Sequence, residues 1–73
     1  MENNIRALRK EAGLTQMELA ELMGISNVTL CRWETGTKLP KLESLFALAQ
    51  LFRVPLDAIY PMDREEGDHA AGA

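Results

Sequence analysis

Apolar residues recur along this chain at the three- and four-residue spacing of helices, and no segment alternates as a strand would. Near the amino terminus, Ile5, Leu8 and Ala12 fall on one helix face. A second segment has the apolar residues Leu19, Ala20, Leu22 and Met23. A longer amphipathic helix is predicted over residues 41–52, with an apolar stripe of Leu42, Leu45, Phe46, Leu48, Ala49 and Phe52. A final short helix is predicted over residues 56–60, so the pattern indicates an all-α fold.

Residues that begin and end helices divide the chain in agreement with this pattern. Thr15 and Glu18 have the spacing of a capping box, in which each side chain bonds the backbone N–H of the other. Gly24 ends the helix that begins there, and Ser26 can cap a third helix, expected over residues 27–34. The other boundary signals are Asn3 or Asn4 as the first cap, and Gly13, Gly36 and Pro61 as stops. Two short helices joined by so tight a turn match a helix-turn-helix.

The helix expected over residues 27–34 has two faces of different chemistry. At about 100° per residue, Leu30, Trp33 and Glu34 share one side. The opposite side consists of Val28, Cys31, Arg32 and Thr35, with Asn27 and Thr29 at its edges. Such a face suits base reading in the DNA major groove, where arginine bonds guanine, asparagine bonds adenine, and valine or threonine methyls contact thymine. An ordinary solvated face has the same composition, so this pattern alone leaves both interpretations open.

Length and charge indicate one small domain. The chain has 73 residues, 47% hydrophobic and 26% charged, which is typical of a folded domain rather than a disordered chain. The net charge of −3 comes entirely from residues 63–73, because residues 1–62 carry seven basic and seven acidic groups. We therefore predict a domain over residues 1–62 and an acidic, disordered tail over residues 63–73. Nucleic-acid-binding proteins usually show a basic surface, so here a few local cations and base contacts would have to supply binding.

The scarcity of cysteine and histidine disfavours several kinds of chemistry. Cys31 and His69 are single residues of their kinds, so we expect no internal disulfide, no metal site and no cofactor. The sequence has no glycine-rich phosphate loop and no histidine near the cysteine, which disfavours an enzyme. No stretch approaches the roughly 18 apolar residues that cross a bilayer, and the amino terminus lacks a signal-peptide core. We therefore expect a cytoplasmic protein with no membrane partner.

Several motifs occur together at consistent spacing between residues 3 and 60. They are Ile5-Arg6-x-Leu8-Arg9, Gly13-Leu14-Thr15-Gln16-x-Glu18-Leu19-Ala20, Gly24-Ile25-Ser26, Trp33-Glu34-x-Gly36, Pro40, Leu45-x-x-Leu48-Ala49 and Phe52-x-Val54. In these residues the chain closely resembles the Cro and lambda-repressor helix-turn-helix family, also called the XRE family. The resemblance implies a compact five-helix domain that binds double-stranded DNA as a homodimer on a two-fold operator. It also implies a transcriptional regulator, and because members of the family are usually repressors, it implies a repressor.

Carried over residue by residue, the resemblance assigns two groups of DNA contacts. The residues that match base-reading positions are Asn27, Val28, Thr29 and Arg32. The residues that match phosphate-contacting positions are Gln16, Lys38 and Lys41, and Thr15, beside Gln16, can also reach the DNA backbone. In the family, the glutamine corresponding to Gln16 also braces the recognition helix. For both lysines, a solvated surface position is the alternative, whereas the helix geometry independently exposes Val28 and Arg32.

Other residues are assigned to the structure. Glu34 lies on the inner side of its helix, and Arg9 matches a family arginine that pairs with it, so we expect a partly buried ion pair. Trp33 lies on the same inner side and is expected to anchor the core. Cys31 is either an oxidation sensor or a small tolerated side chain, and the sequence favours the second, because Arg32 is its only neighbouring cation.

Binding to a protein is the main alternative function. The same fold could sequester a toxin as an antitoxin, or act as an adaptor that never contacts DNA. Four residues near the carboxyl terminus are expected to offer an exposed apolar patch for such a partner or for a second copy: Leu56, Ile59, Tyr60 and Met62.

Overall fold

Five helices make up most of the part of the chain that the computed structural model describes, residues 2–61. They are α1 (Ile5–Glu11), α2 (Gln16–Met23), α3 (Asn27–Thr35), α4 (Leu42–Phe52) and α5 (Leu56–Ile59). Residues 2–61 contain no strand, so the predicted all-α, five-helix fold is confirmed. The last three helices differ from the predicted ranges by one residue at one end each. The predicted domain boundary after residue 62 and the acidic tail lie outside the described residues.

Capping interactions fix the two helices on either side of the tight turn. The Glu18 N–H donates to Thr15 Oγ1 at 3.0 Å, and the Thr15 N–H donates to Glu18 Oε1 at 2.8 Å, which completes the predicted capping box. Gly24 ends α2 in the left-handed conformation, with φ of 69°. Ser26 Oγ accepts from the Thr29 N–H at 3.1 Å and so caps α3. Because hydrogen bonds fix both ends of the turn, the turn also fixes the angle between α2 and α3.

The asparagines that precede α1 do more than cap it. Asn4 stands at the cap position, but its side chain donates to the Ala58 carbonyl at 2.8 Å instead of bonding to α1. The side chain that bonds to α1 belongs to Asn3, whose Oδ1 accepts from the Ile5 N–H at 2.9 Å. Asn3 Nδ2 also donates to the Trp33 carbonyl at 2.9 Å. This segment therefore ties α1 to the end of α3 and to α5.

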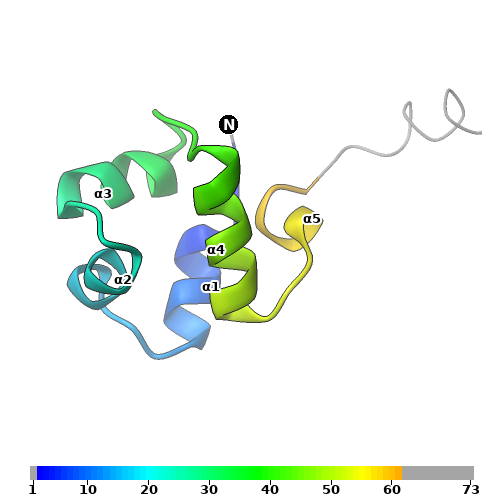
Figure 1. The fold of residues 1–73 in the computed structure, drawn as a ribbon, viewed down its shortest axis with the longest axis horizontal. Coiled ribbons are helices and arrows are strands. Elements are labelled where there is room, and N and C mark those ends of the chain that lie inside the picture. Colours follow the sequence, from blue (N-terminus) through cyan, green and yellow to red (C-terminus); the bar gives the residue numbers. More distant parts are fainter. Residues whose placement is uncertain (1, 62–73) are drawn as a thin grey trace, which may run out of the picture.

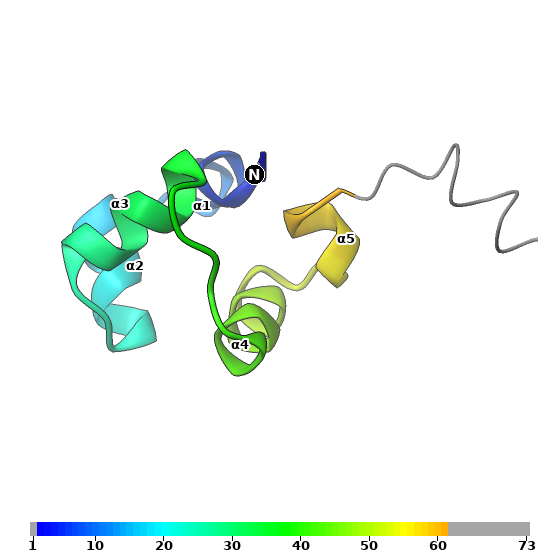
Figure 2. The ribbon, with the colours of Figure 1, turned by 90° about the horizontal axis from the view of Figure 1, so that it is seen from above.

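Each helix contributes one completely buried aliphatic side chain to a single core, namely Ile5, Leu19, Leu30, Leu48 and Ile59. Trp33 is also buried there, as predicted. Figure 1 shows α1 and α4 in the middle, with α2 and α3 on one side and α5 on the other. The view from above in Figure 2 shows the same separation of α3 from α5. The core thus holds α3 by one side and leaves the other side free.

Some apolar residues expected to face inward are instead exposed. Leu42 and Phe46, which belong to the predicted stripe of residues 41–52, are 63% and 52% exposed. Apolar positions cover a wide arc of α4, and the small core covers only the part around Leu48. Two residues grouped with the apolar faces of the first two helices are exposed as well, Ala12 and Leu22.

The prediction of which residues form an exposed apolar patch near the carboxyl terminus is wrong. Ile59 is completely buried and Tyr60 is 8% exposed, because α5 folds back onto the core. Leu56 is half-buried, and Met62 lies outside the described residues. The exposed apolar side chains of this region belong to α4 instead.

Candidate nucleic-acid interface

The outer side of α3 exposes polar side chains together with one aliphatic side chain. Asn27, Cys31 and Arg32 are exposed, and Val28 is 59% exposed. On the opposite side, Leu30 is completely buried. Val28 and Arg32 are four residues apart and therefore neighbours on the helix surface. An aliphatic group and a planar donor of up to five N–H bonds thus lie side by side on this face.

Among the residues expected to read bases, Thr29 differs from the other three. It is half-buried, and its hydroxyl accepts a hydrogen bond from the Ser26 hydroxyl at 3.0 Å. Its own N–H donates to the same serine oxygen. Thr29 therefore takes part in the cap of α3 and lies at the margin of the outer face.

A buried ion pair holds the end of α3 against α1 and α2. Arg9 Nε donates to Glu34 Oε2 at 2.6 Å, and Nη2 donates to Oε1 at 3.4 Å, so the guanidinium contacts both carboxylate oxygens. The two side chains are 9% and 4% exposed. Arg9 Nη1 also donates to the Leu14 carbonyl at 2.9 Å, and Gln16 Nε2 donates to Glu34 Oε1 at 3.1 Å. These bonds join three helices and so fix the orientation of α3.

The start of α2 offers neutral hydrogen-bond donors beside α3. Thr15 is exposed, and because its oxygen accepts from the Glu18 N–H, its hydroxyl proton can still be donated. Gln16 is half-buried and uses one amide N–H for Glu34, which leaves the second. The Glu18 carboxylate in the capping box places a negative charge at the same helix start, which opposes an anion there.

The connection between α3 and α4 carries two exposed lysines. The N–H groups of Thr37 and Lys38 donate to the Arg32 carbonyl at 2.9 and 3.2 Å, which ties this loop to α3. Lys41 is the cap residue of α4 and makes no side-chain capping bond. In Figure 1, α3, the loop and the beginning of α4 lie along the same upper side of the molecule. Lys38 therefore lies in the part of the loop that is tied to α3, and Lys41 lies where α4 begins.

A hollow between α1, α2 and α3 adds a cation, Arg6, that the sequence motifs did not assign to the site. It has a volume of about 340 Å³ and is lined by Arg6, Arg9, Gln16, Cys31, Glu34 and Thr35. Arg9 is paired with Glu34, whereas Arg6 is exposed. Arg6 lies three residues before Arg9 on α1, and this spacing would have indicated that both face the same side. The Cys31 thiol thus shares a hollow with two arginines distant from it in sequence.

Residues 2–61 hold neither a metal-binding cluster nor a membrane span. No three His, Cys, Asp or Glu side chains of that part come together as a metal ion would require. None of its helices combines the length and the apolar character of a membrane span. His69, the single histidine of the chain, lies outside the described residues.

Comparison with known proteins matches most of the chain. The model of the helix-turn-helix family matches residues 5–59, from the start of α1 to the end of α5. Antitoxin PezA of Streptococcus pneumoniae is 43% identical over 51 residues, which are 70% of this chain and 32% of the relative. The cryptic phage CTXphi transcriptional repressor RstR of Vibrio cholerae is 41% identical over 54 residues, which are 74% of this chain and 49% of the relative. The chain therefore spans about a third and about a half of the length of these two relatives.

Another relative is matched over nearly its whole length. An uncharacterized HTH-type transcriptional regulator of Archaeoglobus fulgidus is 32% identical over 66 residues, which are 90% of this chain and 94% of the relative. The family match, this relative and the five-helix fold agree with the resemblance that the sequence motifs indicated. The chain belongs to the helix-turn-helix family of DNA-binding transcriptional regulators, of the Cro and lambda-repressor type.

Proposed function

We propose that the protein is a sequence-specific transcriptional repressor that binds a two-fold operator as a homodimer, with α3 in the major groove of each half-site. The supporting observation is the outer face of α3, where Val28 is 59% exposed next to Arg32. An aliphatic side chain forms no hydrogen bonds with water, but it can pack on a thymine methyl group while the arginine bonds a neighbouring guanine. The similarity to RstR, named a transcriptional repressor, favours repression by promoter occlusion.

The side chains of α3 divide the reading of bases among them. Arg32 suits guanine, because its guanidinium can bond O6 and N7 together. Val28 suits thymine, and Asn27 at the start of the helix suits adenine. Thr29 contributes only at the margin of this surface, because its hydroxyl is bonded to Ser26. The buried ion pair of Arg9 and Glu34 holds the helix in its orientation and contacts no base.

Phosphate contacts fix the register of the protein on the duplex. Lys38 and Lys41 supply two cations per copy, and Arg6 in the hollow beside Gln16 supplies a third. Thr15 and Gln16 add neutral donors from the start of α2. The N–H groups in the first turn of α4, next to Lys41, can also donate to a phosphate.

Selection of bound duplexes from a random DNA library at about 0.15 M salt tests the proposal, because physiological salt suppresses binding by charge alone. We expect a two-fold motif with half-sites about one helical turn apart. Arg32→Ala should lose the preference at one position of each half-site and bind the selected motif about 10- to 100-fold more weakly. Lys10→Ala, which removes an exposed cation of α1 outside the hollow, serves as the control and should select the same motif. Failure of the wild type to enrich any motif would contradict the proposal.

Binding of a protein toxin is the second candidate function, and the similarity to antitoxin PezA favours it. That match covers 32% of the relative, so it concerns only part of that protein. Co-expression distinguishes the two functions. An antitoxin would restore growth to cells that express the toxin encoded by a neighbouring gene. The Arg32→Ala variant of an antitoxin would restore growth as well. A DNA-binding repressor without a toxin partner would show no such rescue.

A further inference from the structure

A hollow between α4 and α5 combines apolar walls with two polar groups, and the proposed contacts with DNA do not use it. It has a volume of about 520 Å³ and is lined by Leu45, Leu56, Asp57 and Tyr60. Binding sites for small organic molecules usually have volumes of about 300 to 1,000 Å³, and they place a few polar groups among apolar walls. The hollow therefore has the size and the composition of a small-molecule site.

One of its polar groups lacks a hydrogen bond. The Tyr60 hydroxyl is the buried side-chain group of residues 2–61 for which no partner is present. The residue is 8% exposed, so water is largely excluded as well. Buried polar groups in proteins are nearly always paired, and one that is not requires an explanation. A ligand in the hollow beside Tyr60 would supply the missing hydrogen bond.

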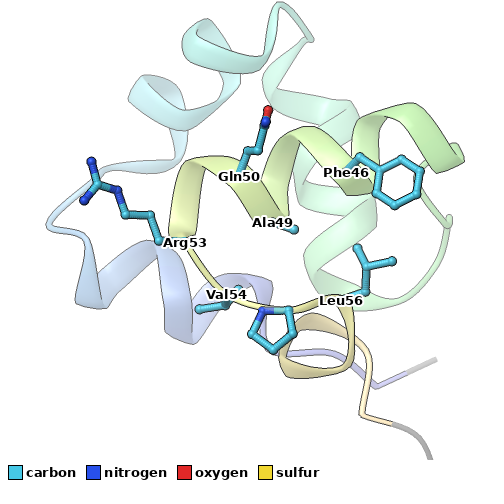
Figure 3. Close-up of a pocket in the computed structure, with 7 residues that line it drawn as sticks. Phe46, Ala49, Gln50, Arg53, Val54 and Leu56 are labelled. Atoms are coloured by element: carbon cyan, nitrogen blue, oxygen red, sulfur yellow. The ribbon is translucent and has the colours of Figure 1, made fainter.

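The apolar walls extend beyond this hollow. An adjoining hollow of about 550 Å³ is lined in part by Phe46, Pro55 and Leu56, and Leu56 borders both hollows. Figure 3 shows the Phe46 ring and the Leu56 side chain on the same side of α4 and α5. The Phe46 side chain is 52% exposed. An apolar ligand can thus cover Leu56 and extend towards Phe46, and removal of these side chains from water favours binding.

The charge at the hollow is negative. Asp57 lies exposed in the first turn of α5, and none of the other three lining residues is charged. Asp57 already interacts within the protein, but a carboxylate has about four acceptor positions, so it can accept from a ligand as well. Arg53 borders the adjoining hollow, but its side chain points away from Leu56 in Figure 3. The charge of the hollow therefore favours a cation over an anion.

We propose that this hollow binds a small organic amine, whose ammonium group bonds to Asp57 and Tyr60 while its apolar part covers Leu45 and Leu56. An ammonium group has three N–H donors and no acceptor, so it suits a carboxylate and a hydroxyl oxygen together. A carboxylate on the ligand would be repelled by Asp57, and an alcohol has only one donor. The Tyr60 oxygen is buried in the free protein, so its ring turns towards the hollow when the amine binds.

Three small molecules with the same apolar part and different polar groups test the proposal: 2-phenylethylamine, 2-phenylethanol and 3-phenylpropanoate. Each is titrated at pH 7 while the backbone amide resonances are followed by NMR. The amine should shift the amides of the residues that line the hollow, with a dissociation constant of about 0.1 to 1 mM, as expected for a ligand with so few atoms. The alcohol should bind about 3-fold more weakly or less, and the carboxylate about 10-fold more weakly or less.

Two substitutions test the polar contacts separately. Asp57→Asn should raise the dissociation constant of the amine about 3- to 5-fold. Its matched control is Glu43→Gln, which removes an exposed carboxylate of α4 outside the hollow and should leave the constant unchanged. Tyr60→Phe should raise the constant about 3- to 10-fold, because one hydrogen bond is lost. Since the unpaired hydroxyl makes Tyr60→Phe the more stable protein, weaker binding by this variant would not result from unfolding. Circular dichroism should show all variants folded.

Three results would overturn the inference. One is a wild type whose amides around the hollow do not shift with about 10 mM amine, ten times the weakest expected dissociation constant. Another is equal affinity for the three small molecules, which would mean that the hollow selects no amine. The third is an amine affinity that neither Asp57→Asn nor Tyr60→Phe changes. None of these measurements involves DNA, so operator binding is supported or contradicted separately.

Discussion

Tyr60 buries a hydroxyl group for which residues 2–61 provide no hydrogen-bond partner. The residue is 8% exposed, so water does not readily replace the missing partner. An unsatisfied polar group in such a place costs folding free energy. Burial also raises the pKa of the Tyr60 hydroxyl, because the charged phenolate is poorly solvated there.

Replacement of this hydroxyl should therefore be favourable. We expect Tyr60→Phe to raise the free energy of unfolding by about 1 kcal/mol at neutral pH. Folding favours the neutral phenol, so the stability of the wild type should not change with this group below about pH 10 and should fall as the pH rises through the raised pKa. Denaturant titrations at pH 7 and above pH 10 should show the advantage of phenylalanine widening in alkali. A less stable Tyr60→Phe at pH 7 would mean that the hydroxyl has a partner.

The pair of Arg9 and Glu34 is satisfied, but it is sensitive to the loss of either partner. Arg9→Met would leave the Glu34 carboxylate buried with only the Gln16 amide, and we expect a loss of about 3 to 5 kcal/mol in the free energy of unfolding. Arg9→Met combined with Glu34→Leu removes both charges and should recover most of that loss. Urea titrations of both proteins would test this, and an equally unstable double variant would contradict it.

At the scale of the helices, left-handed residues set where the chain turns. Among the described residues, Gly13, Gly24 and Gly36 have positive φ, and so does one residue that is not glycine, Arg53, with φ of 59°. A side chain makes this conformation unfavourable by about 1 to 2 kcal/mol. The end of α4 therefore carries backbone strain that the other helix ends avoid.

Opposite substitutions at two of these positions should have opposite effects. Gly24→Ala should cost about 1 to 2 kcal/mol of stability from backbone strain alone, because no atom beyond the two adjacent residues lies within 4 Å of an added Cβ. Arg53→Gly should stabilise the fold by about 0.5 to 1 kcal/mol, since relief of the strain exceeds the greater chain entropy of glycine. Thermal and chemical denaturation would check both signs. A destabilised Arg53→Gly would indicate that the arginine side chain makes a compensating contact.

The helix positions could be predicted from the sequence because their signals are local. Thr15, Glu18, Ser26 and Gly24 act within four residues of themselves, and the structure differs from the predicted ranges by one residue at most in the last three helices. Which apolar residues of α4 are buried could not be predicted. The helix has more apolar residues than this small core covers, and periodicity does not show which of them it covers. The left-handed Arg53 gave no signal either, because arginine is not typical of that conformation.

In the site too, features that depend on local sequence could be predicted, whereas contacts between residues distant in sequence could not. Exposure of Val28 and Arg32 followed from helix periodicity, and burial of Trp33 did too. The hydrogen bond from Asn3 to the Trp33 carbonyl joins residues 30 positions apart, and nothing local indicates it. The presence of Arg6 beside Cys31 likewise depends on how α1 packs against α3. Such contacts are properties of the assembled core.

For the whole molecule, the distribution of charge limits how DNA can be bound. Residues 1–62 are neutral, and the acidic excess lies in residues 63–73. Non-specific attraction to phosphate should therefore be weak, and specificity should depend on base contacts with a few well-placed cations. The proposed set of Arg6, Lys38 and Lys41 provides three such cations per copy.

Salt dependence tests this count of cations. Six charged contacts per dimer predict a slope of about −5 for the logarithm of the affinity against the logarithm of the salt concentration. Arg6→Gln removes two of them and should reduce the slope by about 2 without changing the preferred motif. Fluorescence anisotropy titrations at several salt concentrations would measure both slopes. An unchanged slope for Arg6→Gln would exclude Arg6 from the phosphate contacts.

Mapping where α3 lies on DNA tests operator reading by this helix most directly. Cys31 is the single cysteine of the chain and is exposed on α3, so a photo-activated cross-linker can be attached there alone. With the selected duplex, we expect cross-links to bases in the major groove, in two symmetric clusters about one helical turn, or 10 base pairs, apart. Cross-links confined to the flanks of the bound site, or absent while binding persists, would contradict the claim that α3 reads the operator.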